Sequence, residues 1–101
     1  GSIVCCGARI TVNSKIGKGV VINHGSAVGH DVRLGDYVTL YVNSIVSGTV
    51  EVGDSTEIGS GAFIREYLRI CRDTVIAPLT SVLSNIAEPG TYAGNPARRF
   101  K

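Results

Sequence analysis

The sequence of 101 residues contains no methionine, no tryptophan and only two histidines. It has no apolar run of about 18 residues, so we expect no membrane-spanning helix. No basic N-terminal segment precedes an apolar stretch, so no signal peptide is predicted. The net charge of +2 is too small to indicate a nucleic-acid partner. We therefore expect a cytoplasmic protein that binds neither nucleic acid nor a membrane.

The cysteines are too few and too irregularly spaced for a disulfide framework or a zinc knuckle. Cys5 and Cys6 are adjacent, Cys71 stands alone, and no pair has the CxxC spacing. We interpret all three as small hydrophobic residues of a protein in a reducing compartment, and we expect no bound metal.

An aliphatic residue recurs at every sixth position along most of the chain. These anchor residues are Val4, Ile10, Ile16, Ile22, Val28, Leu34, Leu40, Val46, Val52, Ile58, Ile64, Ile70, Ile76 and Val82. The fourth residue after each anchor is almost always small or β-branched. A period of six does not fit an amphipathic helix, whose apolar positions recur about every 3.6 residues, and it favours short strands joined by corners. A β-sandwich is disfavoured, because its strands recur about every 8 to 12 residues.

Small residues follow many of the anchors. Glycine occupies this place at positions 17, 29, 35, 53 and 59. Because glycine tolerates a positive φ and aspartate tolerates it better than most residues, we expect the sharp bends at pairs such as Gly35-Asp36 and Gly53-Asp54. Each hexad is then one strand and one corner, and we expect every anchor to be buried.

The pattern from Val4 to Leu83 resembles the hexapeptide-repeat acyltransferase superfamily. The resemblance implies an all-β fold, a left-handed parallel β-helix in which three hexads form one triangular coil and residues one coil apart stack directly. The coils would cover about residues 4–83, followed by a short C-terminal tail over 84–101. At this length we expect 1–101 to form a single β-helix domain.

The segment 19–31 looks like the active-site stretch of the acetyltransferases that modify sialic acids and bacterial UDP-amino-sugars. That subgroup has an asparagine, six further residues, and then a histidine followed by an acid, which Asn23, His30 and Asp31 match. The resemblance implies that His30 is the general base for the hydroxyl or amine of a sugar-like acceptor and that Asp31 orients it. An imidazole suits this step, and a carboxylate stabilises the imidazolium that forms. We interpret His24 as a solvated surface residue.

Asn23 and His30 are seven residues apart, which places them at neighbouring corners of one coil. We expect them to meet only across a subunit interface, which predicts a homotrimer, and two such trimers could stack into a hexamer. Gly48 lies one coil above His30, where the family has a glycine whose backbone N–H faces the thioester carbonyl and stabilises the oxyanion. A glycine required only for its turn is the alternative.

The closing segment 88–101 resembles the end of the family's sequences, where a Gly-Asn-Pro-Ala turn precedes basic residues. The resemblance implies that acetyl-CoA is the acyl donor and that its phosphates bind Arg98, Arg99 and Lys101. A merely solvated basic tail is the alternative.

Ala77 and Leu79 stand where the family has glycines that line the pantetheine groove. Their side chains predict a groove that is displaced or blocked. The expected O- or N-acetyltransferase therefore competes with a non-catalytic trimeric scaffold or a degenerate acyltransferase, since unpaired strand edges at the first coil invite stacking. A γ-class carbonic anhydrase is less favoured, because it needs three histidines around zinc and this sequence has two.

Overall fold

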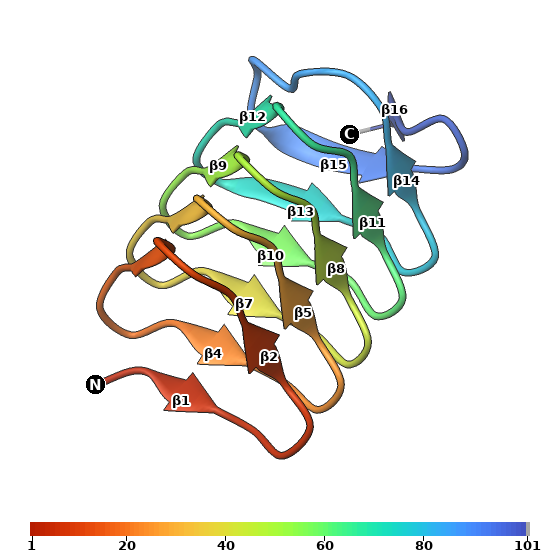
Figure 1. Cartoon of the computed structure of the whole chain (residues 1–101). Coiled ribbons are helices and arrows are strands. Elements are labelled where there is room, and N and C mark those ends of the chain that lie inside the picture. The colour runs from red at the N-terminus through yellow and green to blue at the C-terminus, as the bar shows by residue number, and fades with distance from the viewer. Residues whose placement is uncertain (101) are drawn as a thin grey trace.

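The computed structural model describes residues 1–100, which form a parallel β-solenoid of three sheets (Figure 1). The N-terminus lies at one end of the stack, and each turn of the chain adds one short strand to each sheet. This arrangement confirms the all-β solenoid predicted from the six-residue period. Within the described chain, no helix has the length and apolar character needed to cross a membrane.

Sheet A has seven strands and sheets B and C have five and four. The strands of sheet A are β1 (Ile3–Val4), β4 (Val21–Ile22), β7 (Thr39–Leu40), β10 (Glu57–Ile58), β13 (Thr74–Ile76), β15 (Gly90–Ala93) and β16 (Arg98–Arg99). Sheet B contains β2 (Arg9–Ile10), β5 (Ala27–Val28), β8 (Ile45–Val46), β11 (Phe63–Ile64) and β14 (Ser81–Val82). Sheet C contains β3 (Lys15–Ile16), β6 (Arg33–Leu34), β9 (Glu51–Val52) and β12 (Arg69–Ile70).

The residues between strands form three columns of corners. The A–B corners, between sheets A and B, are 5–8, 23–26, 41–44, 59–62 and 77–80. The B–C corners are 11–14, 29–32, 47–50 and 65–68, and the C–A corners are 17–20, 35–38, 53–56 and 71–73. Parallel pairing in register places each corner directly over the one 18 residues earlier.

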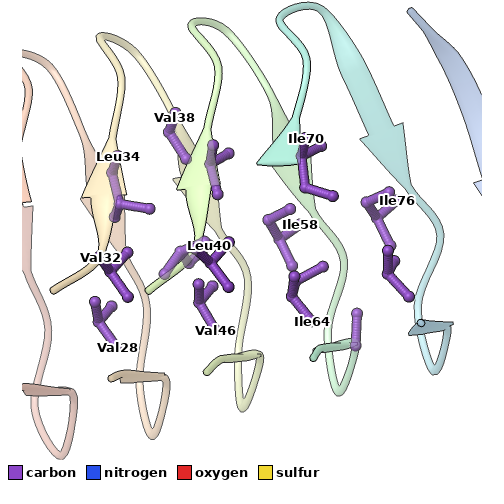
Figure 2. Close-up of a cluster of buried hydrophobic side chains, with 14 of the residues drawn as sticks. Val28, Val32, Leu34, Val38, Leu40, Val46, Ile58, Ile64, Ile70 and Ile76 are labelled. Atoms are coloured by element: carbon purple, nitrogen blue, oxygen red, sulfur yellow. The ribbon is translucent and has the colours of Figure 1, made fainter. Parts of the chain in front are cut away.

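Two side chains of each hexad point into the core. The anchors from Ile22 to Val82 are buried, and Figure 2 shows them stacked along the inside of the coils. The residues four positions after the anchors are buried too, from Val20 to Thr80. The polar ones among them bond to backbone carbonyls, as Ser26 Oγ does to Tyr41 at 2.7 Å. No buried side-chain polar atom in 1–100 lacks a partner.

The expectation that every anchor is buried is wrong at the first coil. Val4 is 51% exposed and Ile10 is 39% exposed. An anchor side chain is covered by the coils on both sides of it, and at this end of the described chain one side is open.

The expectation that Gly35 and Gly53 supply the positive φ of the corners is also wrong. The left-handed residue is the third after each anchor, with φ between +55° and +76° from Gly7 to Leu79. The glycines directly after the anchors instead allow neighbouring coils to lie close together, because they have no side chain. A Cβ on Gly53 would lie 2.3 Å from the backbone nitrogen of Arg72 in the next coil.

The segment after residue 83 continues the stack. Ile86 forms a parallel bridge with Ile70, and β15 pairs in parallel with β13. The chain then reverses, and β16 pairs antiparallel with β15. Arg98 and Arg99 are therefore held at the last edge of sheet A.

Gly53→Ala should lower the free energy of unfolding by about 2 kcal/mol, because the added methyl group would overlap backbone atoms of the next coil. Denaturant unfolding measures this loss. The matched control is Cys71→Ala, at the equivalent corner position one coil higher, where a Cβ is already accommodated and we expect a change of about 1 kcal/mol or less. Equal losses in the two variants would contradict the close-approach explanation.

Candidate active site

His30 and Asp31 lie together on the solvent side of a B–C corner, between β5 and β6. Their side chains are 58% and 50% exposed, so His30 faces outward as the sequence predicts. His30 Nδ1 is 3.0 Å from Asp31 Oδ2. Because a carboxylate can only accept a hydrogen bond, this contact places the proton on Nδ1 and leaves the Nε2 lone pair free to take another proton.

Gly48 lies directly against the His30 ring. A Cβ on Gly48 would be 2.6 Å from His30 Nε2 and 2.9 Å from its Cε1. Gly48 is not among the residues with positive φ, so its turn does not require a left-handed conformation. In this structure the imidazole fills the space that a Cβ on residue 48 would enter, and a larger residue would displace the ring.

The backbone N–H of Gly48 makes no hydrogen bond within residues 1–100. At two of the four C–A corners the equivalent donor is occupied. Asp36 Oδ1 accepts from the Lys18 N–H at 3.0 Å, and Asp54 Oδ1 accepts from the Asp36 N–H at 2.8 Å. The Gly48 corner has no such side-chain cap, so a backbone donor beside His30 remains available to a ligand.

Asn23 begins an A–B corner and does not meet His30 within one chain. Its Nδ2 donates to the Leu40 carbonyl at 2.9 Å, which fixes the amide and leaves Oδ1 free to accept a hydrogen bond. His24, the next residue, is exposed at the same corner. Within residues 1–100, no three His, Cys, Asp or Glu side chains gather as a metal site.

Leu79 and Ala77 lie at the uppermost A–B corner, three coils above the A–B corner that holds Asn23. Leu79 is 80% exposed and has a φ of +57°, a conformation that costs a leucine about 1 kcal/mol or more. Its side chain covers the glycine one coil below, since a Cβ on Gly61 would lie 2.8 Å from Leu79 Cδ2. The leucine therefore occupies the surface of this corner.

The basic C-terminal residues differ in their contacts. Arg99 Nη1 is 3.2 Å from Glu88 Oε2, in an exposed ion pair. Arg98 is exposed, and both arginines line a recess of about 200 Å³ at the last edge of the solenoid. Lys101 lies outside the described residues.

Sequence reasoning missed a hydrogen bond between an A–B corner and sheet A. The Tyr41 hydroxyl donates to Glu57 Oε1 at 2.9 Å. This hydrogen bond, together with partial burial and the negative charge of Glu57, raises the pKa of Tyr41. Tyr41 lies one coil, or 18 residues, after Asn23. Counting one coil on from Asn23 would have identified Tyr41 as the residue that stacks on it.

A groove on the outer face of sheet C was also missed. It has a volume of about 760 Å³, and its charged wall is a column of outward side chains, Lys15, Arg33, Glu51 and Arg69. Its floor includes Gly17, Gly35 and Gly53, which present no side chain. The residue just before every third anchor, from Ile16 to Ile70, is charged. This repeated charge is the sequence signal that could have indicated the groove.

No family model matches the chain, but individual proteins do. The UDP-3-O-acylglucosamine N-acyltransferase of Bordetella avium is 31% identical over 100 residues, which cover 93% of this chain and 28% of that protein. The GDP-perosamine N-acetyltransferase of Escherichia coli O157:H7 is 34% identical over 106 residues, which cover 100% of this chain and 48% of that protein. The chain thus spans about a quarter to a half of the length of these curated relatives.

Solved structures agree with these relatives. A mutant perosamine N-acetyltransferase from Caulobacter crescentus, in complex with CoA and GDP-perosamine, superposes with a TM-score of 0.86 at 27% identity. The match covers 99% of this chain and 53% of that one. Soybean serine acetyltransferase superposes with a TM-score of 0.79 at 28% identity, over 86% of this chain and 40% of that one.

The repeat, the solenoid and these matches define a class: the chain belongs to the hexapeptide-repeat acyltransferase superfamily. Within that superfamily it is similar to N-acyltransferases named for UDP- and GDP-linked sugars.

Proposed function

We propose that this chain is the catalytic β-helix of an acyltransferase that uses acetyl-CoA to acylate the amine or hydroxyl of an amino sugar. The observation that carries the proposal is the exposed His30–Asp31 pair with its free Nε2 against the bare Gly48 backbone. The amino-sugar acceptor is supported by the relatives named as N-acyltransferases of UDP-3-O-acylglucosamine and GDP-perosamine.

The reaction assigns one task to each of these groups. His30 Nε2 takes a proton from the acceptor as its nitrogen or oxygen attacks the thioester carbonyl. The Gly48 N–H donates to the oxyanion of the tetrahedral intermediate, a contact that contributes roughly a hundredfold to a thousandfold in rate. The C–S bond then breaks, and the imidazolium, stabilised by Asp31, returns its proton to the leaving thiolate.

A trimer would complete the site. The outward residues of sheet B form an apolar stripe of Ala27, Ile45 and Phe63 in register, and Ile45 is 44% exposed. The A–B and B–C corners flank this sheet on its two sides. Packing three copies of sheet B around a threefold axis would bury the stripe and bring the partner's Asn23 to His30.

Phe63→Glu should convert a trimer into a monomer, because it places a charge in the stripe that the trimer buries. Light scattering coupled to gel filtration measures the mass. Val75→Glu is the matched control, since Val75 occupies the same place in its hexad on sheet A, and its trimer should persist. A monomeric wild-type chain would refute the trimer.

His30→Ala should leave the fold intact and slow acyl transfer from acetyl-CoA to an amino-sugar acceptor by roughly a hundredfold or more. Truncation of an exposed side chain opens no cavity, so the free energy of unfolding should change by about 0.5 kcal/mol. His24→Ala, at the other exposed histidine, is the control and should keep its rate. An unchanged rate in His30→Ala, or an equal loss in both variants, would show that His30 is not the base.

Leu79→Gly should bind CoA about tenfold more tightly than the wild type, because removal of the side chain uncovers the corner over Gly61. Calorimetric titration measures both affinities, which should fall as salt rises if Arg98 and Arg99 hold the phosphates. Tyr37→Gly is the control, another left-handed corner residue on the C–A column, and should not change the affinity. Absence of CoA binding in every form would favour the non-catalytic scaffold.

A further inference from the structure

At the B–C corners, the residue two places after each anchor lies directly over the one 18 residues earlier. His30, Gly48 and Glu66 hold this place in three successive coils, because β5, β8 and β11 pair in register. The Thr49 N–H bonds to the His30 carbonyl at 2.8 Å, and the Tyr67 N–H bonds to the Gly48 carbonyl at 3.2 Å. Glu66 therefore stands one coil beyond Gly48, towards the C-terminal end of the solenoid.

The same column of corner residues runs on to the basic C-terminal strand. Ser84 follows β14 by two residues, as Glu66 follows β11, and β11 and β14 pair in register. Ser84 lines the recess of about 200 Å³ that Arg98 and Arg99 also line. The column thus leads from the Gly48 corner past Glu66 to these two arginines.

The Glu66 carboxylate has no partner of its own. The side chain is exposed and makes no hydrogen bond or ion pair within residues 1–100. Its neighbour Arg65 is exposed as well, and the two do not pair, whereas Glu51 Oε2 lies 3.5 Å from Arg69 Nε. Glu66 is therefore available to accept a hydrogen bond from a ligand that lies along the column.

The length of the Glu66 side chain keeps the Gly48 N–H open. At a C–A corner, an aspartate in the same place of its hexad caps the backbone one coil below, as Asp54 Oδ1 does for the Asp36 N–H at 2.8 Å. Glu66 has one more methylene group, and its carboxylate makes no such bond to Gly48. The N–H that would hold the thioester oxygen and the carboxylate above it are thus both available to one ligand.

The spacing of these two groups matches the thioester end of coenzyme A. Neighbouring coils are one ladder step apart, about 4.8 Å. In an N-acylcysteamine thioester, two methylene groups join the sulfur to an amide nitrogen, so the thioester carbonyl and the amide N–H are also about one such step apart. With the carbonyl oxygen on the Gly48 N–H, the amide N–H would lie at Glu66, and the rest of the donor would continue towards Arg98 and Arg99.

We propose that Glu66 is a specificity-determining residue, which selects the acyl donor by accepting a hydrogen bond from the amide N–H nearest the thioester sulfur. Hydrogen bonds to a charged group are stronger than those between neutral groups, so a donor with this amide hydrogen is favoured over one that lacks it. This proposal rests on the proposed acyl transfer, because that reaction places the thioester carbonyl on Gly48.

The experiment compares two small acyl donors with glucosamine as the acceptor. S-acetyl-N-acetylcysteamine carries the amide hydrogen, and its N-methyl analogue has the same thioester but no amide hydrogen. In the wild type, kcat/KM should be roughly tenfold higher for the donor with the N–H. Glu66→Ala should remove this preference and leave kcat/KM for the N-methyl donor unchanged. Glu66→Gln, whose amide oxygen still accepts a hydrogen bond, should restore part of the preference.

Asp73→Asn is the matched control. Asp73 is an exposed aspartate at a C–A corner, 4.0 Å from Arg72, and asparagine tolerates its φ of +55°. The substitution changes the net charge by the same amount as Glu66→Ala and should leave the donor preference unchanged. An equal loss of preference in this control would show that only the overall charge matters, and would overturn the assignment of Glu66.

Glu66→Asp tests the geometry of the column. The shorter carboxylate should cap the Gly48 N–H as Asp54 caps the Asp36 N–H. The rate should then fall roughly a hundredfold for both donors, because the group that stabilises the oxyanion is occupied. Full activity of Glu66→Asp with both donors would show that the side chain at this position does not overhang Gly48, and would overturn the proposal.

The two proposals can fail separately. Equal rates with the two donors in the wild type would keep the acyl transfer and refute the role of Glu66. A chain that transfers no acetyl group but binds CoA, with roughly tenfold weaker affinity in Glu66→Ala by calorimetric titration, would refute the proposed function and keep the amide contact. A chain that neither transfers an acetyl group nor binds CoA would overturn both.

Discussion

The structure depends on hydrogen bonds that join each coil to the next at a fixed interval of one turn. The Lys15 N–H bonds to the Val32 carbonyl at 2.8 Å, and the Gly17 N–H bonds to the Leu34 carbonyl at 2.9 Å, a pattern repeated on all three sheets. Because this register allows no insertion, each position of an inner coil has one neighbour above and one below. The corners must then lie as close together as the strands, which explains why bare glycine recurs beside the anchors.

The period of the sequence predicted which positions face the core and which stack on one another. It therefore placed His30 outward and Gly48 above it, and the structure adds that the imidazole ring lies directly against the glycine. The period did not predict which corner residue adopts the left-handed conformation. Leucine and tyrosine have no preference for a positive φ, yet Leu79, Tyr37 and Tyr67 adopt it. The Tyr41–Glu57 pair and the sheet C groove were missed because they depend on side-chain direction across neighbouring strands.

The three faces of the solenoid share one backbone pattern and differ only in the chemistry of their outward side chains. Sheet B carries an apolar stripe, sheet C carries charges, and sheet A carries the tyrosine–glutamate pair and the C-terminal strands. The core beneath all three is nearly the same, built from Val, Ile and Leu with occasional Ser and Thr. Packing energy thus stabilises the frame, while the surface chemistry of each face is set by residues that contribute little to the core.

A stack of coils makes every corner depend on the coil beneath it. In such a stack each layer touches only its neighbours, so contacts between adjacent layers carry the stability. The Asp31 N–H bonds to the Val12 carbonyl of the coil below at 3.0 Å. The backbone of the residue that contacts the His30 imidazole is therefore held in place by a different coil, one layer away from the histidine.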